Sequence, residues 1–170
     1  MISPKMQSAI NEQINKEFFS EFLYRSMQAY FASQDLDGFA TWMDVQCQEE
    51  HFHAMKFFNY LIDRNGKVEL KAISQPAIDF DSPLQAFSEA LKHEQFITES
   101  INTLMDVAIK ENDHASKSFL QWYIDEQVEE ESNVGKVVTR LKLIGKDPQA
   151  LFILDNELGQ RVYVPPVTTQ

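Results

Sequence analysis

Apolar residues recur every three or four positions along most of the chain, a period that indicates amphipathic helices rather than β-strands. The first such stripe begins with Met6, Ile10 and Ile14. A capping residue followed by proline marks several helix starts, as at Ser3-Pro4. The predicted helices cover residues 4–34, 38–65, 83–112 and 114–144, with a short last helix at 148–158.

The connections between these helices predict their directions. The first and second helices are joined by about four residues and the third and fourth by two or three, so each pair should be antiparallel. The middle connection, residues 66–82, is 17 residues long. Extended at about 3.3 Å per residue, it reaches about 55 Å and can run the length of a helix. We therefore expect one all-α domain over residues 1–170, a four-helix bundle with a long crossover that makes the second and third helices parallel.

Polar, mostly acidic side chains interrupt all four long stripes near their middles. Glu17, for example, lies seven residues from both Ile10 and Tyr24 and so shares their face. A lone glutamate on such a stripe usually reaches water, and a lone Glu-x-x-His is common. Here the interruptions coincide in depth, so four carboxylates and one imidazole should meet inside the bundle. The interrupting residues are Glu17, Glu50, His53, Glu94, Gln127 and Glu130.

Such a cluster needs positive charge, because each unpaired buried charge costs several kcal/mol. The chain has 26 acidic and only 15 basic residues, and no lysine or arginine occupies the stripes near that level. We therefore expect bound cations in place of internal salt bridges. Carboxylates with an imidazole suit iron or manganese, and a single cysteine, Cys47, argues against a thiolate zinc site. Two divalent ions sharing one bridging carboxylate would balance about four negative charges.

Composition excludes several other classes of function. A net charge of −11 repels phosphate backbones, so no nucleic-acid partner is expected. No apolar run approaches the roughly 18 residues of a membrane span, and the N-terminus lacks the apolar segment of a signal peptide. One cysteine fits a reducing compartment. The expectation is a cytoplasmic protein with no membrane contact.

Two further features have alternative interpretations. Glu126 and Glu129 belong to a run of glutamates in the fourth helix, and with Glu49 they would form an outer carboxylate site for cations moving to or from the buried pair. The alternative is a solvated acidic face. Tyr24, seven residues from Glu17, would donate an electron or a hydrogen bond near the metals, or would simply pack in the core.

In order and spacing these motifs resemble the bacterial non-haem ferritins over essentially the whole chain. The motifs are Glu17 with Tyr24, Glu50-x-x-His53, Glu94 after the long crossover, and the run LQWYIDEQVEEE that ends at Glu131. The resemblance implies a ferritin-like fold and a ferroxidase that oxidises Fe²⁺ with O₂ or H₂O₂. It also implies that ferric oxyhydroxide is stored as a mineral inside a homo-oligomeric shell of 24 subunits.

The resemblance also implies a role for each site residue. One iron of a di-iron centre would be held by Glu17, Glu50 and His53, and the second by Glu50, Glu94 and Glu130, with Glu50 as the bridge. Gln127 would be a near-ligand or would hydrogen-bond toward bound oxygen. A third, outer iron site would be formed by Glu49, Glu126 and Glu129, with or without a share in Glu130. The fifth helix would line channels at the four-fold axes of the shell.

Differences from the motifs of other ferritin relatives narrow the family to which the chain is assigned. The fourth helix offers Gln127-x-x-Glu130 instead of a second Glu-x-x-His, which disfavours the symmetric site of bacterioferritin. His51 follows Glu50 where bacterioferritin needs its haem-binding methionine, so no haem is expected. The small DNA-protecting ferritin relatives share metal ligands across a subunit interface and often carry basic tails, which does not fit this acidic chain.

Two other functions remain as alternatives. One is a di-iron oxidase or peroxidase similar to rubrerythrin, although the chain lacks the Cys-x-x-Cys pairs of the commonest version. The other is a helical scaffold that only buffers divalent metal.

Overall fold

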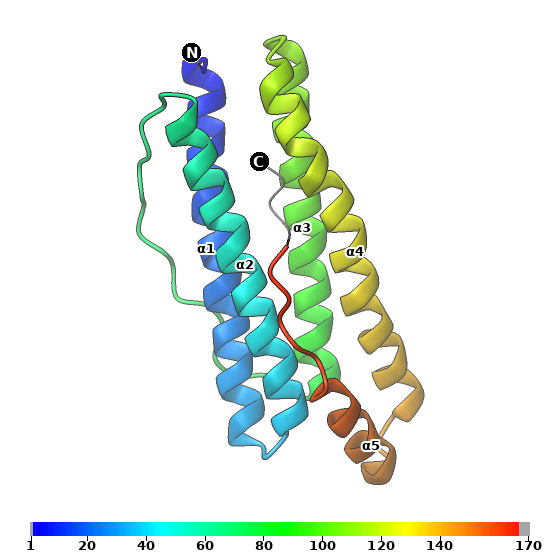
Figure 1. Cartoon of the computed structure of the whole chain (residues 1–170). Coiled ribbons are helices and arrows are strands. Elements are labelled where there is room, and N and C mark those ends of the chain that lie inside the picture. The colour runs from blue at the N-terminus through cyan, green and yellow to red at the C-terminus, as the bar shows by residue number, and fades with distance from the viewer. Residues whose placement is uncertain (1, 167–170) are drawn as a thin grey trace.

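The computed structural model describes residues 2–166, which form five helices and no strands. The helices are α1 (Pro4–Ser33), α2 (Asp37–Asp63), α3 (Pro83–Lys110), α4 (His114–Ile144) and α5 (Pro148–Leu158). The four long helices form a bundle in which α2 and α3 run in the same direction, and α5 lies at one end (Figure 1). The predicted four-helix bundle with a long crossover and a short fifth helix is thereby confirmed.

Helix starts follow the capping signals of the sequence. The hydroxyl of Ser3 accepts a hydrogen bond from the Met6 amide, and Ser82 does the same for Gln85. Three helix ends lie one or two residues before their predicted positions. The reason is a backbone reversal shortly after each end, where Asp35, Asn65 and Asn112 have positive φ angles of 56°, 56° and 53°. Short polar side chains tolerate this left-handed conformation better than most residues.

The crossover is fastened along α1. Asn11 donates its side-chain amide to the Lys67 carbonyl at 2.9 Å and accepts from the Glu69 amide at 2.8 Å. Further along, the Ser26 hydroxyl donates to the Ala77 carbonyl at 2.6 Å. The crossover therefore follows the outside of α1, on the opposite side of the bundle from α4 (Figure 1).

The core consists of two apolar clusters, one toward each end of the bundle. The cluster near α5 is rich in aromatic rings and includes Phe31, Phe39 and Phe87. The cluster at the other end includes Phe57 and Tyr123. The residues that interrupt the stripes are buried in a layer between these clusters, so the middle of the bundle is its polar part. Among the described residues, no helix is both long and apolar enough to cross a membrane.

Helix α5 is seated closely on the start of α2. The Phe39 amide donates to Asp155 Oδ1 at 2.9 Å, and a Cβ added to Gly38 would lie 1.7 Å from the Asp155 carbonyl oxygen. A side chain at Gly38 would therefore push α5 away from α2. Gly135, within α4, has open space around its would-be Cβ.

We expect Gly38→Ala to lower the free energy of unfolding by about 2 kcal/mol or more, because α5 must move to make room. Gly135→Ala is the matched control and should raise that free energy by up to about 1 kcal/mol through helix propensity alone. Denaturant unfolding of the two variants tests the pair. Equal effects of the two substitutions would contradict the close seating of α5.

Candidate metal centre

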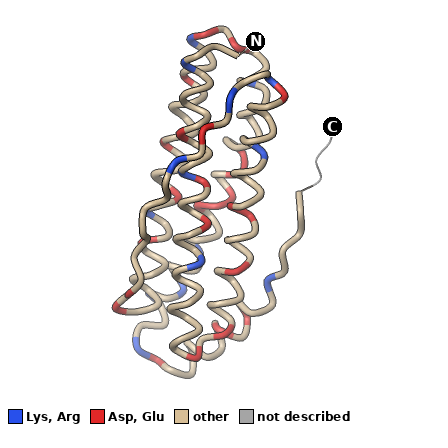
Figure 2. Tube along the Cα trace, turned by 90° about the vertical axis from the view of Figure 1, so that its left-hand side faces the viewer, with Lys and Arg blue, Asp and Glu red and all other residues tan. Residues whose placement is uncertain are grey.

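All four long helices contribute a polar side chain to the layer between the apolar clusters. Each of these side chains is at most 4% exposed, although the layer holds four carboxyl groups. They come from α1 (Glu17), α2 (Glu50 and His53), α3 (Glu94) and α4 (Gln127 and Glu130). The stripe-interrupting residues are thus brought to one depth in the bundle, and Figure 2 shows acidic positions at mid-height on its helices.

Three of these side chains form a compact group. Glu17, Glu50 and His53 each offer one ligand atom, and these atoms lie within 4.8 Å of one another. One oxygen of Glu17, Oε1, accepts a hydrogen bond from Gln13 Nε2 at 2.8 Å. The other oxygen, Oε2, is buried with no hydrogen-bond partner among the described residues. A buried carboxylate oxygen without a donor is costly, and a cation would satisfy it.

A second group of possible ligands combines two buried side chains with one that is only partly buried. His53, Glu126 and Glu130 also offer ligand atoms within 4.8 Å of one another. Glu94 belongs to neither group. It accepts hydrogen bonds from the Tyr24 hydroxyl and, at 3.2 Å, from Gln127 Nε2. The second ligand set implied by the resemblance, Glu50, Glu94 and Glu130, therefore stays a prediction. Tyr24 does more than fill the core, since its hydroxyl orients Glu94.

The three acids of the predicted outer site lie in different surroundings. Glu126 is partly buried beside His53, with 3.9 Å between Glu126 Oε1 and His53 Nε2. Glu129 is exposed on α4. Glu49 is ion-paired with Arg161 at 2.6 Å. This ion pair lies outside the buried cluster of Glu17, Glu50, Glu94 and Glu130, and its basic partner comes from the C-terminal segment and not from a helical stripe.

Burial dominates the electrostatics of the centre. It raises the pKa of Glu17 to about 7 and, together with neighbouring carboxylates, raises the pKa values of Glu50 and Glu130 well above 4.5. Burial also lowers the pKa of His53 to about 3. The imidazole is therefore neutral at physiological pH, as metal coordination requires. Without a cation these shifts favour the protonated form of the carboxyl groups, and a bound metal would displace the protons.

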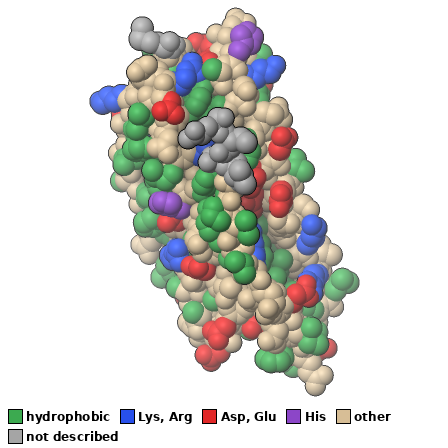
Figure 3. Space-filling view, viewed as in Figure 1, with side chains coloured by type: hydrophobic (Ala, Val, Ile, Leu, Met, Phe, Trp, Pro, Cys, Tyr) green, Lys and Arg blue, Asp and Glu red, His purple; other side chains and the backbone are tan. Residues whose placement is uncertain are grey.

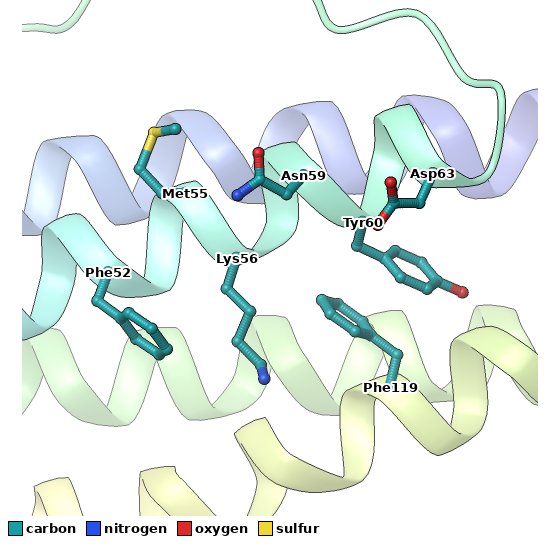
Figure 4. A pocket seen from close by; sticks show the side chains of 7 residues that line it. All are labelled: Phe52, Met55, Lys56, Asn59, Tyr60, Asp63 and Phe119. Atoms are coloured by element: carbon teal, nitrogen blue, oxygen red, sulfur yellow. The ribbon is translucent and has the colours of Figure 1, made fainter. Parts of the chain in front are cut away.

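The ring of His53 is held by aromatic neighbours. Its centroid lies 5.4 Å from that of Trp122 and 6.0 Å from that of Tyr123, whose hydroxyl donates to the His53 carbonyl at 2.8 Å. Lys56 contacts the same aromatic group, with Nζ 4.5 Å from the Trp122 ring centroid. Figure 4 shows Lys56 reaching from α2 toward α4 beside Phe119, in a surface hollow next to the centre.

Sequence reasoning missed several supporting residues. Gln13 receives a hydrogen bond from the Ser100 hydroxyl at 2.5 Å, and Ser100 accepts one from Lys16 Nζ at 2.6 Å, so a chain of polar groups leads from Lys16 to Glu17. Gln46 donates to Glu130 Oε2 at 2.8 Å. Gln13 precedes Glu17 by four residues and Gln46 precedes Glu50 by four. The same-face rule that singled out the glutamates could have found both amides.

A four-helix bundle whose helices all supply carboxylate or imidazole groups to one buried centre defines the class of ferritin-like proteins. A protein-family model described as "Ferritin-like domain", in the family named Ferritin, matches residues 7–144. The chain belongs to the ferritin family.

Individual relatives agree with this assignment. The chain is 40% identical over 163 residues to a bacterial non-heme ferritin of Staphylococcus aureus (strain USA300), covering 96% of this chain and 98% of the relative. Among solved structures, an Archaeoglobus fulgidus ferritin engineered into a closed form matches with a TM-score of 0.95 and 48% identity, over 96% of this chain and 100% of that one. A humanized archaeal ferritin matches with a TM-score of 0.96 and 47% identity, over 97% and 100%. The resemblance to bacterial non-haem ferritins is thereby confirmed.

Proposed function

We propose that this ferritin oxidises Fe²⁺ with O₂ or H₂O₂ at a di-iron centre within each subunit and deposits ferric oxyhydroxide inside a protein shell. The observation that carries the proposal is the group formed by Glu17, Glu50 and His53. It combines a neutral imidazole, two buried carboxyl groups and an oxygen of Glu17 without a hydrogen-bond donor. A centre of this composition suits ferrous iron.

In the proposed reaction Fe²⁺ is the substrate. Glu17, Glu50 and His53 would bind one ion and Glu50, Glu94 and Glu130 the other, so Glu50 would bridge them. Two Fe²⁺ ions supply two electrons, which with two protons reduce O₂ to H₂O₂, or H₂O₂ to two water molecules. The carboxyl groups release protons as the ions bind, and the hydrogen bonds from Tyr24 and Gln127 hold Glu94 in place.

The outer acids and α5 complete the proposal. Glu49, Glu126 and Glu129 would bind a third ion on its way to or from the centre. Phe152 and Ile153 of α5 are 66% and 65% exposed, and these apolar side chains favour packing against further copies of the chain. We propose a shell of 24 subunits.

The chain is also proposed to be cytoplasmic. Cys47 is buried, and burial raises the pKa of its thiol to about 12, so it is unreactive and suits a reducing cytoplasm.

The test combines oxidation with particle size. Metal-free protein is loaded anaerobically with Fe²⁺ and exposed to air while ferric absorbance is recorded, and size-exclusion chromatography with light scattering measures the particle before and after loading. We expect rapid oxidation by a very large particle that retains the iron. Rapid oxidation by a small oligomer would instead identify an oxidase without storage, and iron binding without faster oxidation would identify a metal buffer.

A further inference from the structure

The C-terminal segment, residues 159–166, returns from α5 along the bundle (Figures 1 and 2). Val162 and Val164 are each 75% exposed, so the segment is not anchored by burial of these side chains. In the view of Figure 3, hydrophobic side chains lie along the middle of this face, with acidic groups at their side. In the described part of the segment, Arg161 is the residue whose side chain forms hydrogen bonds to α2.

Arg161 is held by three residues on one face of α2. Its Nη2 donates to Glu49 Oε2 at 2.6 Å, its Nη1 donates to Gln46 Oε1, and its guanidinium carbon lies 4.4 Å from the ring centroid of Trp42. Positions 42, 46 and 49 are spaced by four and three residues, so they share a helix face. The contact combines an ion pair, an amide acceptor and a cation–π interaction, and most of the guanidinium is shielded from water.

This arrangement connects the C-terminal segment to the metal centre. Gln46, which accepts from Arg161, donates its own amide to Glu130 at 2.8 Å. Glu126, Glu129 and Glu130 lie on α4, and Glu49 interacts electrostatically with all three. The guanidinium thus supplies positive charge at the edge of an acidic cluster, which is where the outer metal ion of the proposed function would bind.

We propose that Arg161 is a tethered competitor for metal: its guanidinium holds Glu49 while the outer acids are empty, and a divalent cation bound by Glu49, Glu126 and Glu129 displaces it and frees the C-terminal segment. The inference rests on the proposed function for the outer site. Arg161 holds one oxygen of Glu49, and a divalent cation on the same carboxylate would repel the guanidinium, so the two interactions are linked. By reciprocity, the arginine weakens outer metal binding by the same factor by which metal weakens the hold on the segment.

The test uses Zn²⁺, which binds without oxidation and does not quench fluorescence. Calorimetric titration compares the parent protein with Arg161→Gln and with the control Arg140→Gln, which removes the same charge from an ion pair with Glu157. We expect Arg161→Gln to bind the outer Zn²⁺ roughly 5- to 30-fold more tightly, with a smaller gain at the inner centre, because the charge of Arg161 also acts on Glu130. Arg140→Gln should match the parent. A merely structural role for Arg161 would not predict tighter binding on its removal.

A second readout reports the displacement itself. The chain has two tryptophans, so in a Trp122→Phe background Trp42 is the only one and it contacts Arg161. Zn²⁺ should change Trp42 emission in this background, and the change should be lost when Arg161→Gln is added. Arg161→Lys, which keeps the charge without the paired donors, should give an intermediate affinity. Equal Zn²⁺ affinity and equal emission changes with and without Arg161 would overturn the inference. The proposed function would survive that result, since it fails only if Fe²⁺ is neither bound nor oxidised.

Discussion

Replacing Glu50 by glutamine should slow Fe²⁺ oxidation by about 100-fold or more while making the metal-free protein more stable. Glu50 lies beside both Glu17 and His53 and is the proposed bridge between the two ions. The amide preserves the shape of the side chain but removes the charge that binds metal. Loss of activity through unfolding would lower stability, so opposite changes in rate and stability identify a functional ligand.

The gain in stability has a separate physical reason. Glu50 is fully buried among Glu17, Glu94 and Glu130, and burial followed by repulsion from these groups raises its pKa well above 4.5. The unfolded chain has no such penalty, so the carboxyl group at position 50 destabilises the metal-free fold near neutral pH. We expect the substitution to raise the free energy of unfolding by about 1–3 kcal/mol. Denaturant unfolding in the presence of a chelator measures it.

Glu99→Gln is the matched control for this substitution. Glu99 lies on the exposed surface of α3, the helix that also carries Glu94. Its replacement removes one negative charge but should leave oxidation unchanged, and stability should change by no more than about 0.5 kcal/mol. If Glu50→Gln oxidised Fe²⁺ as fast as the Glu99→Gln control, the bridging role of Glu50 would be wrong.

The metal-free protein should also lose stability as the pH rises from 6.5 to 8.5. Glu17 has a pKa of about 7 in the folded protein and 4.5 in the reference state, and Glu126 is raised to about 7 as well. In this range the folded protein still holds protons that the unfolded chain has lost, so the free energy of unfolding falls with pH. Glu50 and Glu130, with pKa values raised well above 4.5, act in the same direction.

Between pH 6.5 and 8.5 the opposing contribution of His53 is small. His53 has a pKa lowered to about 3, so its contribution to stability is lost only as the pH falls below its unfolded value of 6.5. Above pH 6.5 the carboxyl groups therefore dominate, and we expect a fall of about 1 kcal/mol or more. Unfolding by guanidinium at the two pH values, with a chelator present, measures the change.

Divalent metal should reverse the trend with pH. Zn²⁺ binds the ionised carboxylates and the neutral imidazole, so its affinity and the stabilisation it provides should both grow between pH 6.5 and 8.5. The same unfolding experiment with saturating Zn²⁺ is the internal control. If the stability of the metal-free protein stayed constant or rose over this range, the pKa values of the buried carboxyl groups would not be raised by burial.

Helical periodicity explains how much of the fold and of the metal centre could be predicted from the sequence. In a helix, residues three, four and seven apart lie on one face, so the burial of Glu17, Glu50 and His53 follows from their distance to apolar neighbours along the chain. The caps at Ser3 and Ser82 are equally local. The exact ends of the helices were less predictable. Asparagine tolerates the left-handed backbone conformation that Asn65 adopts, but an asparagine in the sequence does not require it.

The sequence alone therefore determined the helices, their directions and the residues that meet in the middle of the bundle, because all of these depend on spacing within one helix or on the length of a connection. Only the tertiary structure decided which polar groups face each other across helices: Tyr24 and Gln127 on Glu94, Gln46 on Glu130, and above all Arg161 on Glu49. Arg161 lies in a segment with no repeating pattern, more than a hundred residues from its partner. Hydrophobic periodicity cannot predict such a contact, because it forms only when the chain after α5 folds back over α2.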